Sequence, residues 1–322
     1  MMLQWVSVTT VLAPAWLIRL HAAYLKLLGA HLCVYFIDRP ASYTEAELTE
    51  LSQHAKLVLC DDAYWQSVGG RPDEVPNRQL KNLRFARAQV DARWLLHIDI
   101  DEFPYFTGDI GRMLDSAPVE VSDFHFQNVE RLLVRGGAHW HDGLLRVPNF
   151  DKELQALHYG ERTPFLGAGL ACYFHGKSLV KNRPRLIQGV HTAMHVHPQQ
   201  ELVRMTIPLH EGFLVHYPCI SPRHLAHRLR RNKFRVPNVH KFRHEHMLDN
   251  FMFGPDARAE HIDIAIAALH TCTTEQARAW TEAGLCRPMP HTCLQLLEQA
   301  AGATDVLGVG FAERSFADFY RD

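Results

Sequence analysis

Three acidic residues crowd the end of an apolar run in the stretch WLLHIDIDEF, residues 94–103. Asp99, Asp101 and Glu102 repel one another, and burying such like charges is unfavourable without a positive partner. If the run is a strand, Asp99 and Asp101 share one face, because side chains two residues apart point the same way. Two adjacent carboxylates offer hard oxygen ligands to Mg²⁺ or Mn²⁺. The alternative is a solvated or salt-bridged strand end.

Strands and helices alternate before this stretch. The patterns predict strands at 5–12, 32–37, 56–60 and 94–98, and helices at 14–28, 44–54 and 77–92. Such alternation is typical of an α/β fold with a Rossmann-type, mostly parallel sheet and right-handed crossovers. Ligands of open sheets bind beyond the carboxyl ends of the strands, where Asp38, Asp61 and Asp62 lie as Asp99 does. The sequence therefore predicts one acid-lined crevice.

The pattern changes after residue 110. Short strand-like pieces appear at 119–127, 170–174, 185–190 and 212–217, and helices are predicted at 221–234, 257–269, 273–283, 291–301 and 311–320. Two helix starts carry capping boxes, Thr44 with Glu47 and Thr273 with Gln276. We expect a catalytic domain over 1–220 and a mainly helical region over 221–322 packed on it.

Composition excludes some classes of function. The net charge of −1 over 322 residues implies no general affinity for nucleic acid. The seven cysteines form no CxxC pair, so buried thiols in a reducing compartment are expected, Cys33 and Cys60 among them. The first residues lack a signal-peptide pattern, and no apolar run reaches the ~20 residues of a membrane span. These features predict a cytoplasmic protein.

Several segments resemble bacterial glycosyltransferase family 2-like proteins with the GT-A fold. WLLHIDIDEF resembles their DxDEF stretch, and QLKNLRFARAQVDARW resembles the helix before it. FHGKSLV (174–180), GVH (189–191) and FLVHYPCISPRHLAHRLRR (213–231) resemble later segments in the same order. The likeness covers most of 5–235. LAPAW and IDRPAS depart from it, because relatives carry an Asn-Glu pair and an Asp/Asn/Ser-rich turn there.

This resemblance implies a nucleotide-sugar donor, a UDP-sugar above all, with Mn²⁺ or Mg²⁺ as cofactor. It places Asp38 near the base or ribose with Asp61 or Asp62 lining the same pocket, Asp99 near the ribose or sugar, and Asp101 on the metal. The metal ligands it implies are Asp99, Asp101 and a late histidine, His216, with His175 as the alternate. The metal would neutralise the charge on the departing diphosphate.

Other charged residues have open roles. Lys177 could contact the diphosphate as a point charge and Arg84 could do similar work, although either could be a solvated surface residue. Inverting transfer to a hydroxyl of a glycan or lipid-linked acceptor needs a general base. Asp142, in HWHDG, is the first candidate for this base, and the other candidates are Glu211, Asp151 and Glu153. The basic helix 221–235 presents a solvated face or contacts diphosphate, an acidic acceptor or the inner face of a membrane.

Three alternatives remain. HTAMHVH (191–197) suggests zinc, but it lacks the glutamate of H-E-x-x-H. A nucleotidyltransferase is a second Mg²⁺-dependent enzyme class, although VTTVLAPAW lacks the glycine-rich phosphate loop that such enzymes usually carry. A non-catalytic carbohydrate-binding relative of the same fold is the third, and metal-independent glycan binding would distinguish it.

Overall fold

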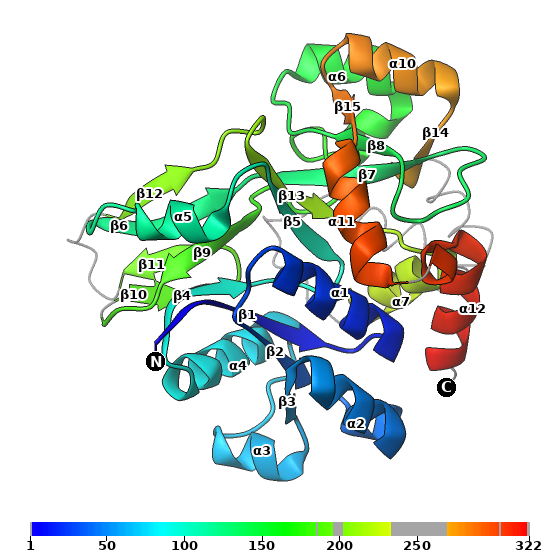
Figure 1. Cartoon of the computed structure of the whole chain (residues 1–322). Helices are drawn as coiled ribbons and strands as arrows, with labels where there is room; N and C mark the ends of the chain where they lie inside the picture. The colour runs from blue at the N-terminus through cyan, green and yellow to red at the C-terminus, as the bar shows by residue number, and fades with distance from the viewer. Residues whose placement is uncertain (1, 185, 196–201, 233–268, 303, 321–322) are drawn as a thin grey trace. The chain divides into compact units, whose positions relative to one another are not determined.

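The computed structural model describes residues 2–184, 186–195, 202–232, 269–302 and 304–320 (Figure 1). The chain forms two compact units that interleave along the sequence. Unit 1 comprises residues 1–127, 175–214 and 299–301, and unit 2 comprises 128–174, 215–298 and 302–322. The sequence had suggested a single boundary near residue 220. Composition could not indicate the interleaving, because it depends on which distant strands pair.

Unit 1 is an α/β unit built on a seven-stranded sheet. Its elements are β1 (Leu3–Val11), α1 (Ala15–Leu27), β2 (Leu32–Ile37), η1 (Pro40–Ser42), α2 (Glu45–His54), β3 (Lys56–Leu59), α3 (Asp62–Ser67), α4 (Val75–Gln89), β4 (Ala92–His97), β5 (Glu102–Phe106), α5 (Ile110–Asp115), β6 (Val121–Phe126), β9 (Lys177–Lys181), β10 (Leu186–Gln188), β11 (Ala193–His195) and β12 (Val203–Thr206). The strand order is β12-β6-β9-β4-β1-β2-β3. β10 and β11 form a separate antiparallel pair.

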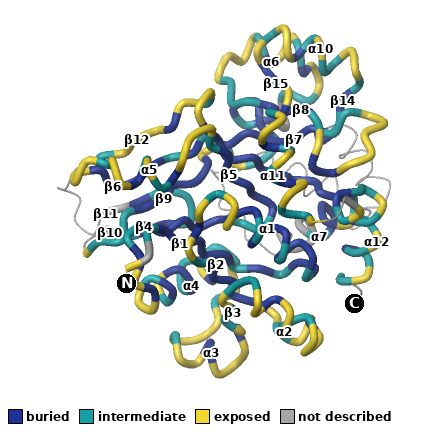
Figure 2. Tube along the Cα trace, viewed as in Figure 1, coloured by how far each residue is buried: buried dark blue, intermediate teal, exposed yellow. Residues whose placement is uncertain are grey.

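The predicted parallel sheet is confirmed. β1 pairs in parallel with both β2 and β4, and β2 pairs in parallel with β3. β9 is antiparallel to both of its neighbours, β4 and β6. β2 reads as a continuous apolar run because helices cover both faces of the sheet there, and Figure 2 shows β1, β2 and β4 as buried.

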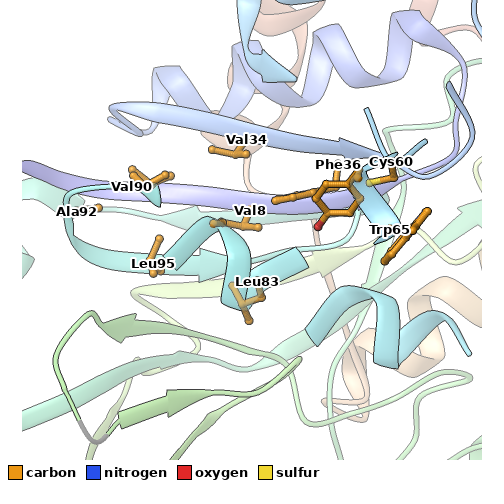
Figure 3. Packing of buried hydrophobic residues seen from close by; sticks show 12 residues of the cluster. Val8, Val34, Phe36, Cys60, Trp65, Leu83, Val90, Ala92 and Leu95 are labelled. Atoms are coloured by element: carbon orange, nitrogen blue, oxygen red, sulfur yellow. The ribbon is translucent and has the colours of Figure 1, made fainter. Parts of the chain in front are cut away.

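Alternate side chains of β1 and β2 pack against different helices. Val8 and Val34 belong to a core cluster that includes Leu83 of α4 and Trp65 of α3 (Figure 3). The opposite face packs on α1, where the Tyr35 hydroxyl lies 2.7 Å from Nδ1 of His21. This two-sided packing fixes where the carboxyl ends of the strands emerge.

Both predicted capping boxes are present. Thr44 Oγ1 accepts the amide N–H of Glu47 at the start of α2, and the Glu47 carboxylate accepts the N–H of Thr44. Thr273 and Gln276 do the same at the start of α10 (Thr274–Glu282). Because each box satisfies backbone N–H groups that the helix itself cannot, these two helix starts could be read from the sequence.

Unit 2 contains short strands and helices. Its elements are β7 (Asn128–Val134), β8 (Leu144–Arg146), α6 (Lys152–Tyr159), η2 (Gly160–Phe165), α7 (Pro222–Asn232), β14 (Thr271–Cys272), α10, β15 (Cys286–Pro288), α11 (His291–Ala301), η4 (Thr304–Leu307) and α12 (Val309–Phe319). β13 (Gly212–His216) continues from unit 1 into unit 2, and the last three residues of α11 belong to unit 1. β8 pairs antiparallel with β7 and with β15, while β14 pairs in parallel with β7.

A second core lies within unit 2. Leu132 of β7, Leu144 of β8 and Trp280 of α10 are buried in one cluster with Tyr159 of α6. The Trp280 indole N–H donates to the carbonyl of His158, and its ring lies 5.0 Å from that of Tyr159. The pairing of β8 with β15 joins segments about 140 residues apart in the chain, a contact that local patterns cannot predict.

Three expectations from the sequence have different outcomes. Residues 170–174 form no strand, because the amide N–H groups of Ala171 and Cys172 donate to the Glu130 carboxylate instead of to a neighbouring strand. The helix expected at 257–269 falls almost wholly outside the described residues. Among the helices that the structure describes, none is long and apolar enough to cross a bilayer.

Candidate functional site

The three acids of the DIDEF stretch lie at a tight turn that joins β4 to β5, with Glu102 as the first residue of β5. The amide N–H of Glu102 donates to the carbonyl of Asp99 at 3.1 Å, which closes a β-turn over residues 99–102. The Glu102 carboxylate in turn accepts the amide N–H of Asp99 at 2.8 Å. The expectation that Asp99 and Asp101 share one strand face is therefore wrong in its geometry, because β4 ends at His97 and the chain reverses at the aspartates.

Lys177 is the positive partner of two of these acids, Asp99 and Glu102. Its ammonium donates to Oδ2 of Asp99 at 2.8 Å and lies 3.5 Å from Oε2 of Glu102. It also donates to the carbonyl of Val190 at 3.2 Å. β9 runs antiparallel to β4, so its first residue, Lys177, lies beside the end of β4. The side chain is fully buried, which contradicts the alternative of a solvated lysine.

The ion pair keeps both partners charged. Burial is the largest single effect on Lys177 and would lower its pKa, but attraction to Asp99 and Glu102 together with the hydrogen bonds to both raises it. Burial is also the largest single effect on Asp99 and would raise its pKa, but attraction to the Lys177 ammonium, its hydrogen bond and smaller effects together lower it. Lys177 therefore fixes Asp99 as a carboxylate at neutral pH.

Asp99 has a second protein partner and remains partly accessible. The Gln79 side-chain amide of α4 donates to Oδ1 of Asp99 at 2.5 Å. The Asp99 side chain nevertheless stays 31% exposed. Because each carboxylate oxygen has two lone pairs, these bonds orient the group without using all of its acceptor capacity. Asp101 is buried in the same turn.

Histidines close to the turn are uncharged at neutral pH. His97 Nδ1 lies 3.0 Å from the Val190 carbonyl, and burial lowers the pKa of His97 to about 4. His191 Nδ1 lies 3.2 Å from the Gly176 carbonyl, and burial lowers its pKa to about 3. His21, whose pKa burial lowers to about 4, lies between the Tyr35 hydroxyl and the Glu102 carbonyl. His21 therefore helps to position the turn through the Glu102 carbonyl, whereas His97 and His191 contact backbone carbonyls outside it.

The burial of these histidines predicts a loss of stability in mild acid. Between about pH 6.5 and 4 the unfolded chain binds a proton at His97 that the folded chain excludes, so unfolding takes up protons. The full contribution is present above pH 6.5 and is lost as pH falls toward the folded pKa. At pH 5 the loss for one such histidine is about 2 kcal/mol. Urea titrations at pH 7, 6 and 5 measure it.

Two variants separate His97 from other sources of this pH dependence. In His97→Gln the free energy of unfolding should depend less on pH than in the wild type, and the difference should equal the contribution of one histidine. This comparison of slopes holds whatever the substitution does to stability at pH 7. His210→Gln, which changes a ring that is 81% exposed, is the matched control. An identical slope in the wild type and in His97→Gln would show that His97 does not titrate on unfolding in this range.

Asp38 has arginine partners at the end of β2. Its Oδ1 lies 3.2 Å from Nη2 of Arg71 and 3.3 Å from Nε of Arg78. Arg78 is buried and also donates to the carbonyls of Pro72 and Asp73. The Arg71 side chain is 38% exposed and thus remains available to an anion. A nucleotide contact by Asp38 stays a prediction.

The other nucleotide-side candidates are exposed. Asp61 caps α3 by accepting the amide N–H of Tyr64, and both Asp61 and Asp62 are exposed. Arg84 is on the exposed face of α4, whereas Arg78 and Gln79 are on its buried face. The sequence analysis did not identify Arg78 and Gln79. Their spacing along the helix from Asn82 and Leu83 places them on the same face, and this pattern could have indicated that they are buried.

The candidate general bases fall in different units. Asp142, in unit 2, is exposed, and its Oδ1 accepts the amide N–H of Gly143. Gly143 has φ of +136°, and a Cβ there would lie 2.2 Å from the Leu132 carbonyl oxygen, so this turn requires glycine. Glu211, in unit 1, is exposed and lies 3.6 Å from the His210 ring. Asp151 caps α6, and Glu153 is exposed.

His216 and the basic helix belong to unit 2. The His216 ring groups with Glu130 and Cys172, while the alternate His175 is exposed in unit 1. In α7 the Arg223 amide N–H donates to Glu313 of α12. The side chains of 228–232 and residues 233–235 lie outside the described part, as does His197 of the HTAMHVH stretch, and membrane contact stays a prediction.

The carboxylates at the turn are the residues that could hold a divalent cation. Two of them, from Asp99 and Glu102, lie beside the Lys177 ammonium, and Asp101 is buried in the same turn. Carboxylate oxygens are the ligands that Mg²⁺ and Mn²⁺ prefer. No protein-family model and no curated protein matches the sequence.

Proposed function

We propose that the protein is a metal-dependent glycosyltransferase of GT-A type that transfers a sugar from a nucleotide-sugar donor to a hydroxyl of a glycan or glycolipid. One observation carries this proposal. The turn holding Asp99 and Asp101 follows β4, and the sheet order changes direction between β1 and β4. Open α/β sheets bind their ligands outside the strand ends at such a switch point.

The charges near these strand ends support a donor with a diphosphate. Asp99 and Asp101 would hold the divalent cation, which when bound neutralises the charge that develops on the leaving diphosphate. Lys177 keeps Asp99 ionised and oriented, so its role is to position this ligand. Arg71, partly exposed beside Asp38, can pair with a phosphate oxygen. Asp142 and Glu211 stay the candidates for taking the acceptor proton.

Metal-dependent binding of a nucleoside diphosphate tests this proposal. We expect Mn²⁺ to raise the affinity for UDP at least about tenfold, or about 1.4 kcal/mol, because the ion links the acids to the diphosphate. Asp101→Asn keeps the side-chain shape, removes a charged ligand, and should abolish the Mn²⁺ effect. Isothermal titration calorimetry with UDP, with and without Mn²⁺, measures both.

A matched control is Asp115→Asn, which changes a 67% exposed aspartate at the end of α5 and should leave UDP binding unaltered. If neither UDP, GDP, CDP nor ADP binds with or without Mn²⁺, the transferase proposal is wrong. A Mn²⁺ effect that survives in Asp101→Asn would place the ion elsewhere.

The Lys177–Asp99 pair favours a second candidate, a non-catalytic carbohydrate-binding protein of the same fold. In such a protein the lysine already balances part of the acidic charge without an ion. Glycan binding that is indifferent to metal, together with unchanged binding in Asp101→Asn, would support it over the transferase.

A further inference from the structure

Three potential metal ligands converge in unit 2, from segments far apart in the sequence. Glu130 is in β7, Cys172 is in the loop before β9, and His216 ends β13. One ligand atom of each residue, a carboxylate oxygen, Sγ and an imidazole nitrogen, lies within 4.8 Å of the other two. Zinc at ordinary bond lengths holds such atoms roughly 3.5 Å apart, so small side-chain rotations close the group around an ion.

We propose that Glu130, Cys172 and His216 bind a zinc ion. The donor set of one thiolate, one imidazole and one carboxylate suits Zn²⁺ better than Mg²⁺ or Mn²⁺, which prefer oxygen ligands. Three protein ligands leave a fourth position for water or substrate. This site is distinct from the ion proposed at Asp101, and it does not depend on the proposed transferase activity.

The backbone around the cluster fixes two of its ligands. Asn128 and Glu130 are two residues apart on β7, and both bind the loop that carries Cys172. The Asn128 side chain donates to the Tyr173 carbonyl at 2.8 Å, while Glu130 accepts the N–H groups of Ala171 and Cys172 at 2.7 and 2.6 Å. Hydrogen bonds of this kind orient ligating carboxylates in metal sites.

Glu130 is ready as a charged ligand, because its carboxylate lies 3.4 Å from the Arg146 guanidinium. Binding then requires the Cys172 thiol to release its proton, which makes the site bind more tightly as pH rises. Glu130 and His216 are buried, while Cys172 is partly exposed and gives an ion access.

Cobalt provides the direct test. One equivalent of Co²⁺ should give the wild-type protein a thiolate-to-metal charge-transfer absorption that zinc displaces. Cys172→Ser should lose this absorption, and His216→Gln should bind at least about tenfold more weakly. Cys219→Ser, a buried cysteine of the same unit outside the cluster, and Asp101→Asn should keep it.

A second measurement uses the wild-type protein and therefore does not depend on whether the variants fold. Cys172 is the one partly exposed cysteine, since the other six are buried. Zn²⁺, but not Mg²⁺, should protect Cys172 from alkylation by iodoacetamide, as read by peptide mass spectrometry. Equal labelling with and without Zn²⁺, or cobalt absorption that persists in Cys172→Ser, would overturn the proposal. The three side chains would then be a hydrogen-bonded group that binds no zinc.

Discussion

Replacing Lys177 by methionine should lower the free energy of unfolding by about 3–5 kcal/mol, because it leaves the buried Glu102 and the partly buried Asp99 without their ion-pair partner. Lys177 is fully buried, and its ammonium contacts both Asp99 and Glu102. Methionine has a similar length and fills the same space, so the loss reflects charge rather than a cavity. Urea denaturation followed by circular dichroism measures the change.

Three comparisons isolate that cause. Lys181→Met changes the other lysine of β9, which donates to the Val119 carbonyl, and should cost less than about 1 kcal/mol. The Lys177→Met loss should shrink toward pH 4, where the acids can bind protons. Adding Asp99→Asn to Lys177→Met should restore part of the stability. A loss of under 1 kcal/mol that does not vary with pH would contradict the ion pair.

Local patterns were sufficient for β1 to β4 and for the helices α1, α2 and α4 of unit 1, but not for α3, β5, α5 or β9. Leu32–Ile37 was read from its continuous apolar run, and the start of α2 from Thr44 and Glu47. Both depend on neighbours within a few residues. The domain boundary and the missing strand at 170–174 could not be read in this way, because each depends on contacts with Glu130 or with strands that are distant in the sequence.

For the same reason, only part of the candidate site could be predicted from the sequence. The sequence indicated that the acids needed a positive partner, and HGK drew attention to Lys177, but their pairing follows from β9 running antiparallel beside β4. Gln79 and Arg78 were missed, since a polar residue on a helix carries no sign of the partner it will meet. Glu130 was missed because it stands inside the apolar stretch NVERLLV, where its neighbours suggest only a strand.

Arg146→Met should also lower the free energy of unfolding by about 3–5 kcal/mol. Arg146 is fully buried, and it pairs with Glu130 at 3.4 Å and donates to the Leu269 carbonyl at 2.8 Å. Its guanidinium also lies over the Tyr159 ring at 5.4 Å. Glu130 keeps its two backbone N–H donors in the variant, so this loss should fall at the lower end of that range. Urea denaturation of the wild type and the variant measures it.

A double-mutant cycle with Glu130→Gln distinguishes the charge from the packing. If the uncompensated carboxylate causes the loss, Glu130→Gln combined with Arg146→Met should be more stable than Arg146→Met alone, because no buried charge remains. Arg19→Met breaks an ion pair whose side chains are 42% and 49% exposed and should cost under about 1 kcal/mol. Strictly additive losses in the cycle would show that Arg146 stabilises unit 2 through its contacts with Leu269 and Tyr159 and that the ion pair contributes little.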